Sequence, residues 1–195
     1  MSSVHDHQLL ERIAGGEREA FEALYASYAS RLFGFALRVT RDPDLVDEVV
    51  NDTLLAVWRS AARFGGRSQP STWIFGIAYR KALRALAGRR RREPTIELPD
   101  SRRDDRPGAD VVLERRESLS VVTGALRKLP AEQRAVVELT FLHGLSYKEV
   151  AEAIGCPVNT VKTRMFHARR KLHDALDRVG LSRPTSGPSS SPRSG

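Results

Sequence analysis

Apolar residues recur at spacings of three and four over most of residues 8–92 and 118–179, which predicts helices. Asp42 is a candidate N-cap, and Pro43 fits the first helical position of a helix that runs to about Phe64. The pattern therefore predicts an all-α protein that consists of two small helical domains.

The stretches between and after the helices differ from them in composition. Residues 93–117 are rich in proline and charge with weak apolar periodicity, which predicts a flexible linker. Residues 181–195 are rich in serine, proline and glycine and are expected to be disordered. The expected organisation is a first domain over 1–92, the linker, a second domain over 118–180 and this tail.

The segment over residues 145–172 predicts two helices joined by a tight turn. Ser146 and Glu149 have the spacing of a capping box at the start of the first helix. Gly155 suits the left-handed backbone position that ends it, and Pro157 suits the first turn of the next helix. The inner seam of that second helix is apolar: Val161, Met165, Ala168 and Leu172. A preceding helix from Pro130 is expected to bury a further apolar set: Val136, Val137, Leu139, Phe141 and Leu142.

The outward positions of the second helix are mostly polar or basic. They are Asn159, Thr160, Lys162, Thr163, Arg164, Phe166, His167, Arg169, Arg170 and Lys171. Together with the caps and the tight turn, this composition favours a helix-turn-helix whose second helix enters a DNA major groove. The alternative is a basic amphipathic helix on the surface of an all-α domain.

Composition limits the partners and the chemistry. The formal net charge of +8 and the pI of about 10.2 favour an anionic partner, with nucleic acid ahead of an anionic membrane. The N-terminus does not resemble a signal peptide, and no apolar run approaches the roughly 20 residues of a membrane span. We therefore expect a cytoplasmic protein without membrane insertion. No metal or cofactor site is expected, since no Cys/His cluster has zinc-ligand spacing.

Cys156 is the one cysteine of the chain, so an internal disulfide is impossible. It lies at the junction of the helix-turn-helix, where a small side chain serves packing. Packing is therefore favoured over redox sensing.

The helix that begins at Pro43 concentrates acidic residues, and no lysine or arginine occurs in it before Arg59. The helix macrodipole favours acid near the N-terminus, but Asp52 lies too far along for that account. The acidic side chains are Asp42, Asp44, Asp47, Glu48 and Asp52. They form either a solvated surface or a docking patch for a basic partner.

A polar loop over 65–70 precedes another helix, for which Ser71 or Thr72 is the expected N-cap. Aromatic and basic residues alternate there, as in proteins that stack the bases of single-stranded DNA. The alternative is that the aromatic residues belong to the core. A place in the core is preferred for Phe75 and for the neighbouring Ile77. For Trp73, both a place in the core and a role in base stacking stay possible.

Three segments, in this order and at these separations, resemble the extracytoplasmic-function (ECF) group of the sigma-70 family of bacterial transcription initiation factors. They are DPDLVDEVVNDTLLAVWR, FGGRSQPSTWIFGIAYRKAL and LPAEQRAVVELTFLHGLSYKEVAEAIGCPVNTVKTRMFHARRKL. The resemblance covers roughly residues 8–178. It implies a non-catalytic subunit that binds core RNA polymerase, confers promoter specificity and supports promoter melting. It also implies regulation by an anti-sigma factor.

The resemblance implies a role for each segment. The acidic helix would bind core polymerase through Asp44, Asp47, Glu48, Asn51 and Asp52. The loop and the following helix would open the −10 element through Phe64, Ser71, Trp73, Arg80, Lys81 and Arg84. The helix-turn-helix would recognise the −35 element, with base edges contacted by Lys162, Thr163, Phe166 and His167. Phosphates there would be contacted by Asn159, Thr160, Arg164, Arg169 and Lys171.

Two other classes of protein were weighed against this resemblance. A conventional helix-turn-helix regulator, such as one with a LuxR-like output domain, also carries a TVK recognition helix. Its receiver domain would alternate strands with helices, and the N-terminal half shows no strand pattern. An enzyme is disfavoured, because no glycine-rich phosphate loop, metal cluster or nucleophile motif is present.

Overall fold

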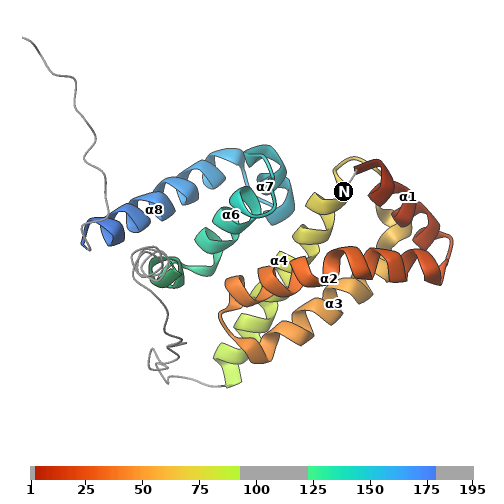
Figure 1. Cartoon of the computed structure of the whole chain (residues 1–195), viewed down its shortest axis with the longest axis horizontal. Helices are drawn as coiled ribbons and strands as arrows, with labels where there is room; N and C mark the ends of the chain where they lie inside the picture. The colour runs from red at the N-terminus through yellow and green to blue at the C-terminus, as the bar shows by residue number, and fades with distance from the viewer. Residues whose placement is uncertain (1–2, 93–122, 179–195) are drawn as a thin grey trace, which may run out of the picture.

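The computed structural model describes residues 3–92 and 123–178, and every regular element in these two ranges is a helix (Figure 1). The prediction of an all-α fold with two small helical units is confirmed. The linker predicted over 93–117 and the tail predicted over 181–195 lie outside the described residues.

The first unit packs α2, α3 and α4 alongside one another, with α1 at one end (Figure 1). Its elements are α1 (Ser3–Ala14), α2 (Arg18–Thr40), η1 (Pro43–Leu45), α3 (Val46–Ser60), η2 (Ala61–Arg63) and α4 (Pro70–Arg92). The expected N-cap is confirmed, because the Asp42 side chain accepts a hydrogen bond from the backbone N–H of Asp44 at 3.1 Å. Pro43 follows at the first position of the short 3-10 turn that leads into α3.

Large side chains from three helices fill the core of this unit. Tyr28 and Phe35 of α2 and Phe75 of α4 are fully buried, and the rings of Phe35 and Phe75 meet edge to face at 5.4 Å. The preference for a buried Phe75 and a buried Ile77 is confirmed. Along α2, however, the apolar spacing also includes three side chains that are 39–45% exposed: Tyr25, Phe33 and Leu37.

The start of α4 differs from the prediction. Neither Ser71 nor Thr72 is an N-cap, because the helix already begins at Pro70 and both lie within its first turn. The backbone N–H of Trp73 donates to the carbonyl of Gln69 at 3.1 Å. A proline is well placed there, since the first helical residue needs no intrahelical N–H partner and prefers the φ that the ring imposes.

The second unit contains the predicted helix-turn-helix. Residues 123–127 are helical and are followed by α6 (Ala131–Phe141), α7 (Tyr147–Ile154) and α8 (Val158–Asp177). The capping box is present, with Glu149 N–H donating to Ser146 Oγ at 3.3 Å and Ser146 N–H donating to Glu149 Oε2 at 2.8 Å. Gly155 ends α7 with a φ of 69°, and Pro157 immediately precedes α8.

The prediction that Phe141 and Leu142 are buried is wrong, since they are 60% and 59% exposed. Val136, Val137 and Leu139 of the same helix are buried as expected. Helix α6 ends at Phe141, so the last two apolar residues of the run leave its buried face.

The two units contact one another directly. Helix α4 packs against α7, and α2 packs against α6, so that the C-terminal unit lies beside the long helices of the first (Figure 1). Buried residues of both units belong to one continuous core cluster. No feature of the sequence had predicted this contact.

Candidate nucleic-acid and protein interfaces

Helix α8 places its apolar seam inward and its basic face outward. Val161, Met165 and Ala168 are fully buried against the rest of the second unit, while Leu172 is half-buried. The exposed outward side chains are Asn159, Lys162, Thr163, Phe166, Arg169, Arg170 and Lys171. The helix therefore presents a continuous polar and basic surface of the kind that contacts duplex DNA.

Three of the predicted −35 residues are half-buried: Thr160, Arg164 and His167. The ring of His167 lies 5.6 Å from that of Phe166, which is itself 62% exposed. Arg164 faces the first unit, where burial raises the pKa of Tyr79 and the nearby guanidinium of Arg164 opposes that rise. Arg169 stacks over the exposed ring of Phe141 at 5.8 Å.

The predicted −10 residues gather around the start and middle of α4. The rings of Phe64 and Trp73 lie 5.1 Å apart, and both side chains are half-buried against the core. Trp73 therefore packs on the core while part of its ring stays accessible for stacking. Ser71 is half-buried beside it.

Arginine and lysine side chains line a hollow further along α4. Arg80 and Arg84 are exposed, and the ammonium of Lys81 lies 2.7 Å from Asp52 of α3. The hollow has a volume of about 270 Å³, and its lining is Ala56, Ser60, Ile77, Arg80, Lys81 and Arg84. It is a basic surface between α3 and α4 that suits a phosphate backbone.

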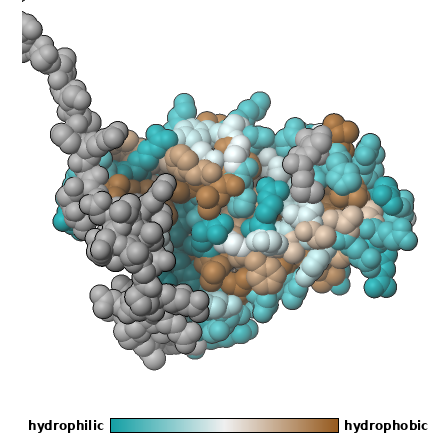
Figure 2. Space-filling model, viewed as in Figure 1, coloured by the Kyte–Doolittle hydropathy of each residue, from teal (hydrophilic) through white to brown (hydrophobic). Residues whose placement is uncertain are grey.

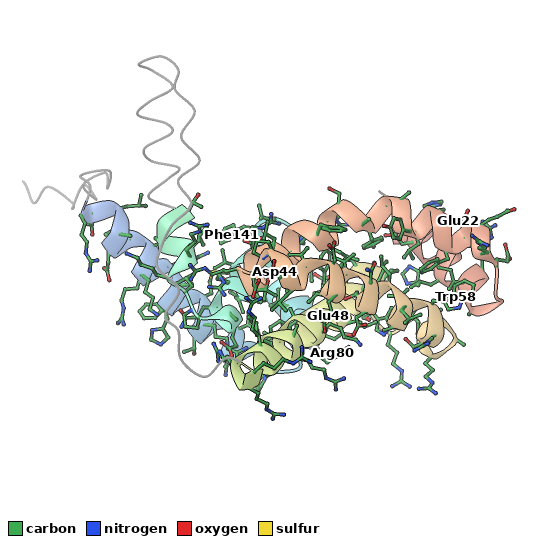
Figure 3. All side chains as sticks on the ribbon, turned by 90° about the horizontal axis from the view of Figure 1, so that it is seen from below. Glu22, Asp44, Glu48, Trp58, Arg80 and Phe141 are labelled. Carbon is green, nitrogen blue, oxygen red and sulfur yellow. The ribbon has the colours of Figure 1, made fainter. Side chains whose placement is uncertain are left out.

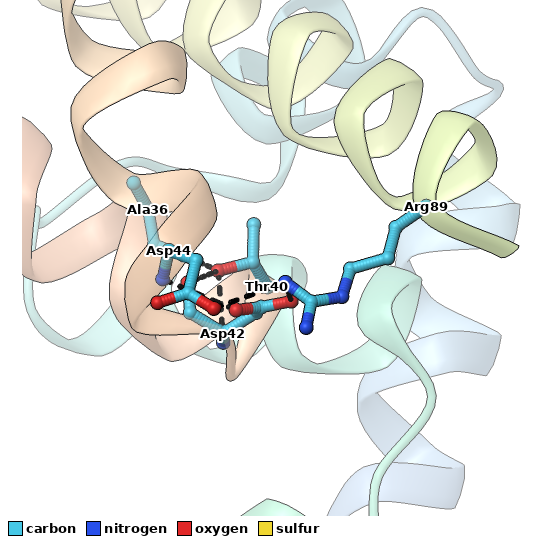
Figure 4. A network of polar contacts seen from close by, with 5 residues as sticks. All are labelled: Ala36, Thr40, Asp42, Asp44 and Arg89. Carbon is cyan, nitrogen blue, oxygen red and sulfur yellow. Dashed lines mark hydrogen bonds and ion pairs between the residues drawn. The ribbon is translucent and has the colours of Figure 1, made fainter. Parts of the chain in front are cut away.

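The residues expected to contact core polymerase, together with Asp42, divide into two groups. Asp42 and Asp44 share the guanidinium of Arg89, at 2.8 Å and 3.3 Å, next to a buried Thr40 that donates to the Ala36 carbonyl (Figure 4). Asp52 is paired with Lys81. The second group consists of Asp47, Glu48 and Asn51, which are exposed on α3. These three polar side chains are therefore accessible to another protein.

An apolar groove adjoins that acidic face. It has a volume of about 360 Å³ between α2 and α3, and its lining is Arg18, Phe21, Tyr25, Asn51, Leu54, Leu55 and Trp58. Phe21 and Trp58 meet edge to face at 5.3 Å within it. In Figure 3, Asp44, Glu48 and Trp58 follow one another along the same side of the molecule, with Glu22 near the Trp58 end.

Sequence reasoning missed most of this groove. In the sequence, Tyr25 and Leu55 have the same spacing as the buried apolar residues of their helices. In the structure each of them is 43% exposed. Figure 2 shows apolar patches of this sort set within a mainly hydrophilic surface. A charged rim beside an apolar centre is the usual composition of a protein–protein interface.

Comparisons with known proteins fit both units. Residues 24–92 match the family model for sigma-70 region 2, and residues 120–172 match the model for sigma-70 region 4. The chain is 31% identical over 180 residues to the ECF RNA polymerase sigma-E factor of Haemophilus influenzae, a match that covers 88% of this chain and 95% of that protein. The chain belongs to the ECF group of the sigma-70 family. A second ECF sigma factor, SigK of Mycobacterium tuberculosis, is 33% identical over 181 residues, with 87% and 92% covered.

Solved structures of sigma factors share the fold. The structure of CnrH in complex with the cytosolic domain of CnrY has a TM-score of 0.65 and 28% identity, and covers 89% of this chain and 98% of CnrH. The structure of RpoE in complex with the anti-sigma factor NepR from Bartonella quintana has the same TM-score at 24% identity, with 80% and 96% covered. The region 2 match includes the acidic and −10 residues of this sigma factor, and the region 4 match includes its −35 residues.

Two further features bear on the remaining predictions. His173, Asp174 and Asp177 are the one group of potential metal-ligating side chains close together within residues 3–92 and 123–178, and all three are exposed. His173 Nδ1 already pairs with Asp177 at 2.7 Å. None of the helices in the described ranges is long and apolar enough to cross a membrane.

Proposed function

We propose that this sigma factor is the promoter-specificity subunit of a cytoplasmic RNA polymerase and has no catalytic activity of its own. It binds core polymerase through α3, recognises duplex −35 DNA with α8, and holds the melted −10 element along α4. The observation that carries the proposal is the opposite charge of two exposed faces. The acidic side chains exposed on α3 give this chain a surface for a protein partner. The basic side chains exposed on α8 give it a surface for DNA.

The polymerase contact combines charge with apolar area. Asp47, Glu48 and Asn51 supply a polar face, and the groove beside it supplies Tyr25 and Leu55. A helical partner with basic residues and a few apolar anchors fits such a surface, because charges orient the encounter and the anchors contribute most of the binding energy. Asp44 and Asp52 contribute less to this contact, because each already has a cationic partner within the chain.

The −35 contact uses the outward face of α8. Lys162, Thr163, Phe166 and His167 face base edges in this proposal, and the remaining polar and basic side chains contact phosphates. The hydroxyl of Thr163 donates to the backbone carbonyl of Asn159 at 2.9 Å. Its methyl group is therefore the part more suited to a base, such as the methyl of thymine.

The −10 contact combines rings with cations. Phe64 and Trp73 offer aromatic surface for an unstacked base, and Arg80, Lys81 and Arg84 neutralise the adjoining phosphates. Taking a base out of the stack costs a few kcal/mol, so stacking on rings of this kind offsets part of that cost. Ser71 lies in the first turn of α4 beside them.

We extend to this chain the anti-sigma partner that its family implies. The relatives of similar fold were solved as complexes, CnrH with the cytosolic domain of CnrY and RpoE with the anti-sigma factor NepR. The acidic face and groove of α3 would then serve both polymerase and inhibitor, in competition.

Run-off transcription tests the proposal directly. Core polymerase supplied with the purified chain is expected to start transcripts at defined positions on a genomic promoter library, and core polymerase alone is not. If the chain binds duplex DNA but never changes where core polymerase starts, it is a conventional helix-turn-helix regulator instead. The proposal would then be wrong for the first unit.

A further inference from the structure

Three aromatic side chains lie in a row where α1 packs against η2 and α4 (Figure 1). The ring centroids of His7 and Phe64 are 5.6 Å apart, and those of Phe64 and Trp73 are 5.1 Å apart. Each of the three side chains is half-buried, so each keeps part of its ring accessible. The proposed function assigns Phe64 and Trp73 to the −10 contact and gives His7 no role. This aromatic row, which consists of His7, Phe64 and Trp73, continues the −10 surface onto α1.

Helix α1 is anchored on both sides of His7, which fixes the position of the His7 ring. The neighbouring Asp6 is only 6% exposed and accepts a hydrogen bond from the Tyr28 hydroxyl of α2 at 2.6 Å. Leu9 and Leu10 of the same helix are fully buried. A ring that is held in place before binding loses less conformational freedom when a ligand stacks on it.

Exposed guanidinium groups flank the aromatic row. Arg63 of η2 directly precedes Phe64, and Arg67 follows it in the loop before α4; both arginines are exposed. The basic hollow between α3 and α4 lies further along α4. Rings bordered by cations are the usual composition of surfaces that bind single-stranded nucleic acid, because bases stack on the rings while the cations neutralise phosphates.

The spacing of the rings suits an unstacked strand better than a duplex. Successive nucleotides of a duplex strand are about 3.4 Å apart along the helix axis. Both steps between ring centroids in the aromatic row are longer than that. Two neighbouring bases that lie on different rings are therefore splayed apart, as they are in a melted strand. Histidine is one of the side chains on which such unstacked bases stack.

We propose that His7 is a further DNA-binding residue, and that the aromatic row holds two successive bases of a melted strand. The first base stacks on Trp73 and Phe64, and the second stacks on Phe64 and His7. Arg63 and Arg67 contact the phosphates beside them. This inference rests on the proposed −10 contact and extends it by one base, from α4 to α1.

The primary experiment measures the affinity of the full chain for two fluorescein-labelled single strands. Each is about eight nucleotides long, within the site sizes of single-strand-binding domains. One strand is oligothymidine, and the other is the same backbone without bases. His7→Ala is expected to bind oligothymidine about tenfold more weakly than the wild-type chain, the usual cost of losing one stack between a base and a ring. Its affinity for the abasic strand should not change, because that strand has no base to stack.

Two further variants separate base stacking from support of the fold. His7→Phe keeps an aromatic ring and should bind oligothymidine within about twofold of the wild-type chain. His5→Ala removes an exposed histidine from the same helix and should have no effect. If His7→Ala loses the same factor on both strands and unfolds at a lower temperature, His7 only supports α1, and the proposal is overturned. Unchanged binding of oligothymidine by His7→Ala would overturn it as well.

The two arginines should behave differently from the histidine. Arg63→Ala with Arg67→Ala is expected to weaken binding of both strands by the same factor, since both strands carry phosphates, and to reduce the salt dependence of the affinity. Arg12→Ala with Arg18→Ala removes the same charge from exposed positions outside the aromatic row and should have a smaller effect. Equal effects of the two double variants would overturn the phosphate contacts.

Trp73→Ala distinguishes failure of this inference from failure of the proposed −10 contact. Weaker binding of oligothymidine in Trp73→Ala but not in His7→Ala would overturn the second base and leave the −10 contact standing. Unchanged binding in both variants would refute the −10 contact and this inference with it. If His7→Ala behaves as expected and the run-off assay fails, the two-base contact stands and the proposed promoter function is refuted.

Discussion

Helices α3 and α8 are built alike and present opposite charges. Each buries one apolar stripe, with Val49, Val50 and Val57 in α3 and Val161 and Met165 in α8. The acidic charge of α3 and of the turn before it is partly neutralised within the chain, because Asp52 of α3 pairs with Lys81 and Asp44 of η1 pairs with Arg89. Most of the base on α8 stays exposed. The difference indicates that α8 meets a polyanion over its whole face, whereas α3 meets a partner at a smaller unpaired patch.

The largest expected effect comes from reversing the charge of that unpaired patch. Asp47→Lys with Glu48→Lys should weaken binding to core polymerase about 100-fold, since attraction becomes repulsion within an interface. Titration of labelled core polymerase measures it. The control, Glu11→Lys with Glu19→Lys, changes the net charge equally on exposed residues outside the patch and should have little effect. An equal loss in both variants would mean that α3 has no special role.

Low pH should open the contact between the two units. Burial first, then the positive charges of Arg31 and Arg38, lowers the pKa of His143 from 6.5 to about 4. A lowered histidine pKa favours the neutral, closed form, so this stabilisation is present above pH 6.5 and is lost as pH falls towards 4. Between pH 7.5 and 5.5 the ratio of open to closed chains should rise about tenfold, because only the open form takes up a proton on His143 in this range.

A second titratable group between the two units, Glu138, limits the pH range of that measurement. Burial raises the pKa of Glu138 while Arg38 opposes the rise, so protonation of Glu138 favours the closed form at lower pH. The opening is therefore best followed above pH 5.5, by energy transfer between dyes attached at two exposed positions, Ala62→Cys and Asp174→Cys, with Cys156→Ser to remove the native thiol. In His143→Phe the pH dependence should disappear; if it persists, another group controls opening.

Lys162→Ala tests what the basic face of α8 contributes beyond charge. A lysine that contacts a base edge should, when removed, reduce discrimination at one −35 position by about fivefold to tenfold. Binding to a randomised −35 duplex followed by sequencing measures this. Lys171→Ala is the matched control and should weaken all sequences alike. If both variants behave alike, Lys162 contacts phosphate.

The smallest effect is expected at Asp52. Its partner Lys81 lies at 2.7 Å, but both side chains are partly exposed, so Asp52→Asn should change core binding less than about threefold. A loss comparable with that of the Asp47 and Glu48 double variant would place Asp52 inside the polymerase interface. The distinction between acidic residues that form an ion pair within the chain and those that do not would then be wrong.

Local signals predicted local structure well. Ser146 and Glu149 form the capping box, Asp42 caps the turn before α3, and Gly155 adopts the left-handed conformation that ends α7. Each depends on residues close in sequence, whose geometry is set by the backbone hydrogen bonds of a helix end.

Long-range contacts were not predictable in the same way. Arg38 and Glu138 are 100 residues apart, and helical spacing does not indicate which polar side chains will meet across an interface. Spacing also fails where an apolar run exceeds the width of the buried face, as at Phe141 and Leu142. The groove beside α3 was missed for this reason, because exposed and buried apolar residues share one spacing.

The central claim is that one chain directs polymerase through two separate DNA contacts. It is tested most directly by transcription from a promoter library randomised across both the −10 and −35 elements, with core polymerase and the purified chain, followed by sequencing of the transcribed templates. The account predicts two enriched motifs at a fixed spacing, and loss of the upstream motif alone when Lys162 and Phe166 are changed to alanine. A single enriched motif, or start sites that match those of core polymerase alone, would contradict it.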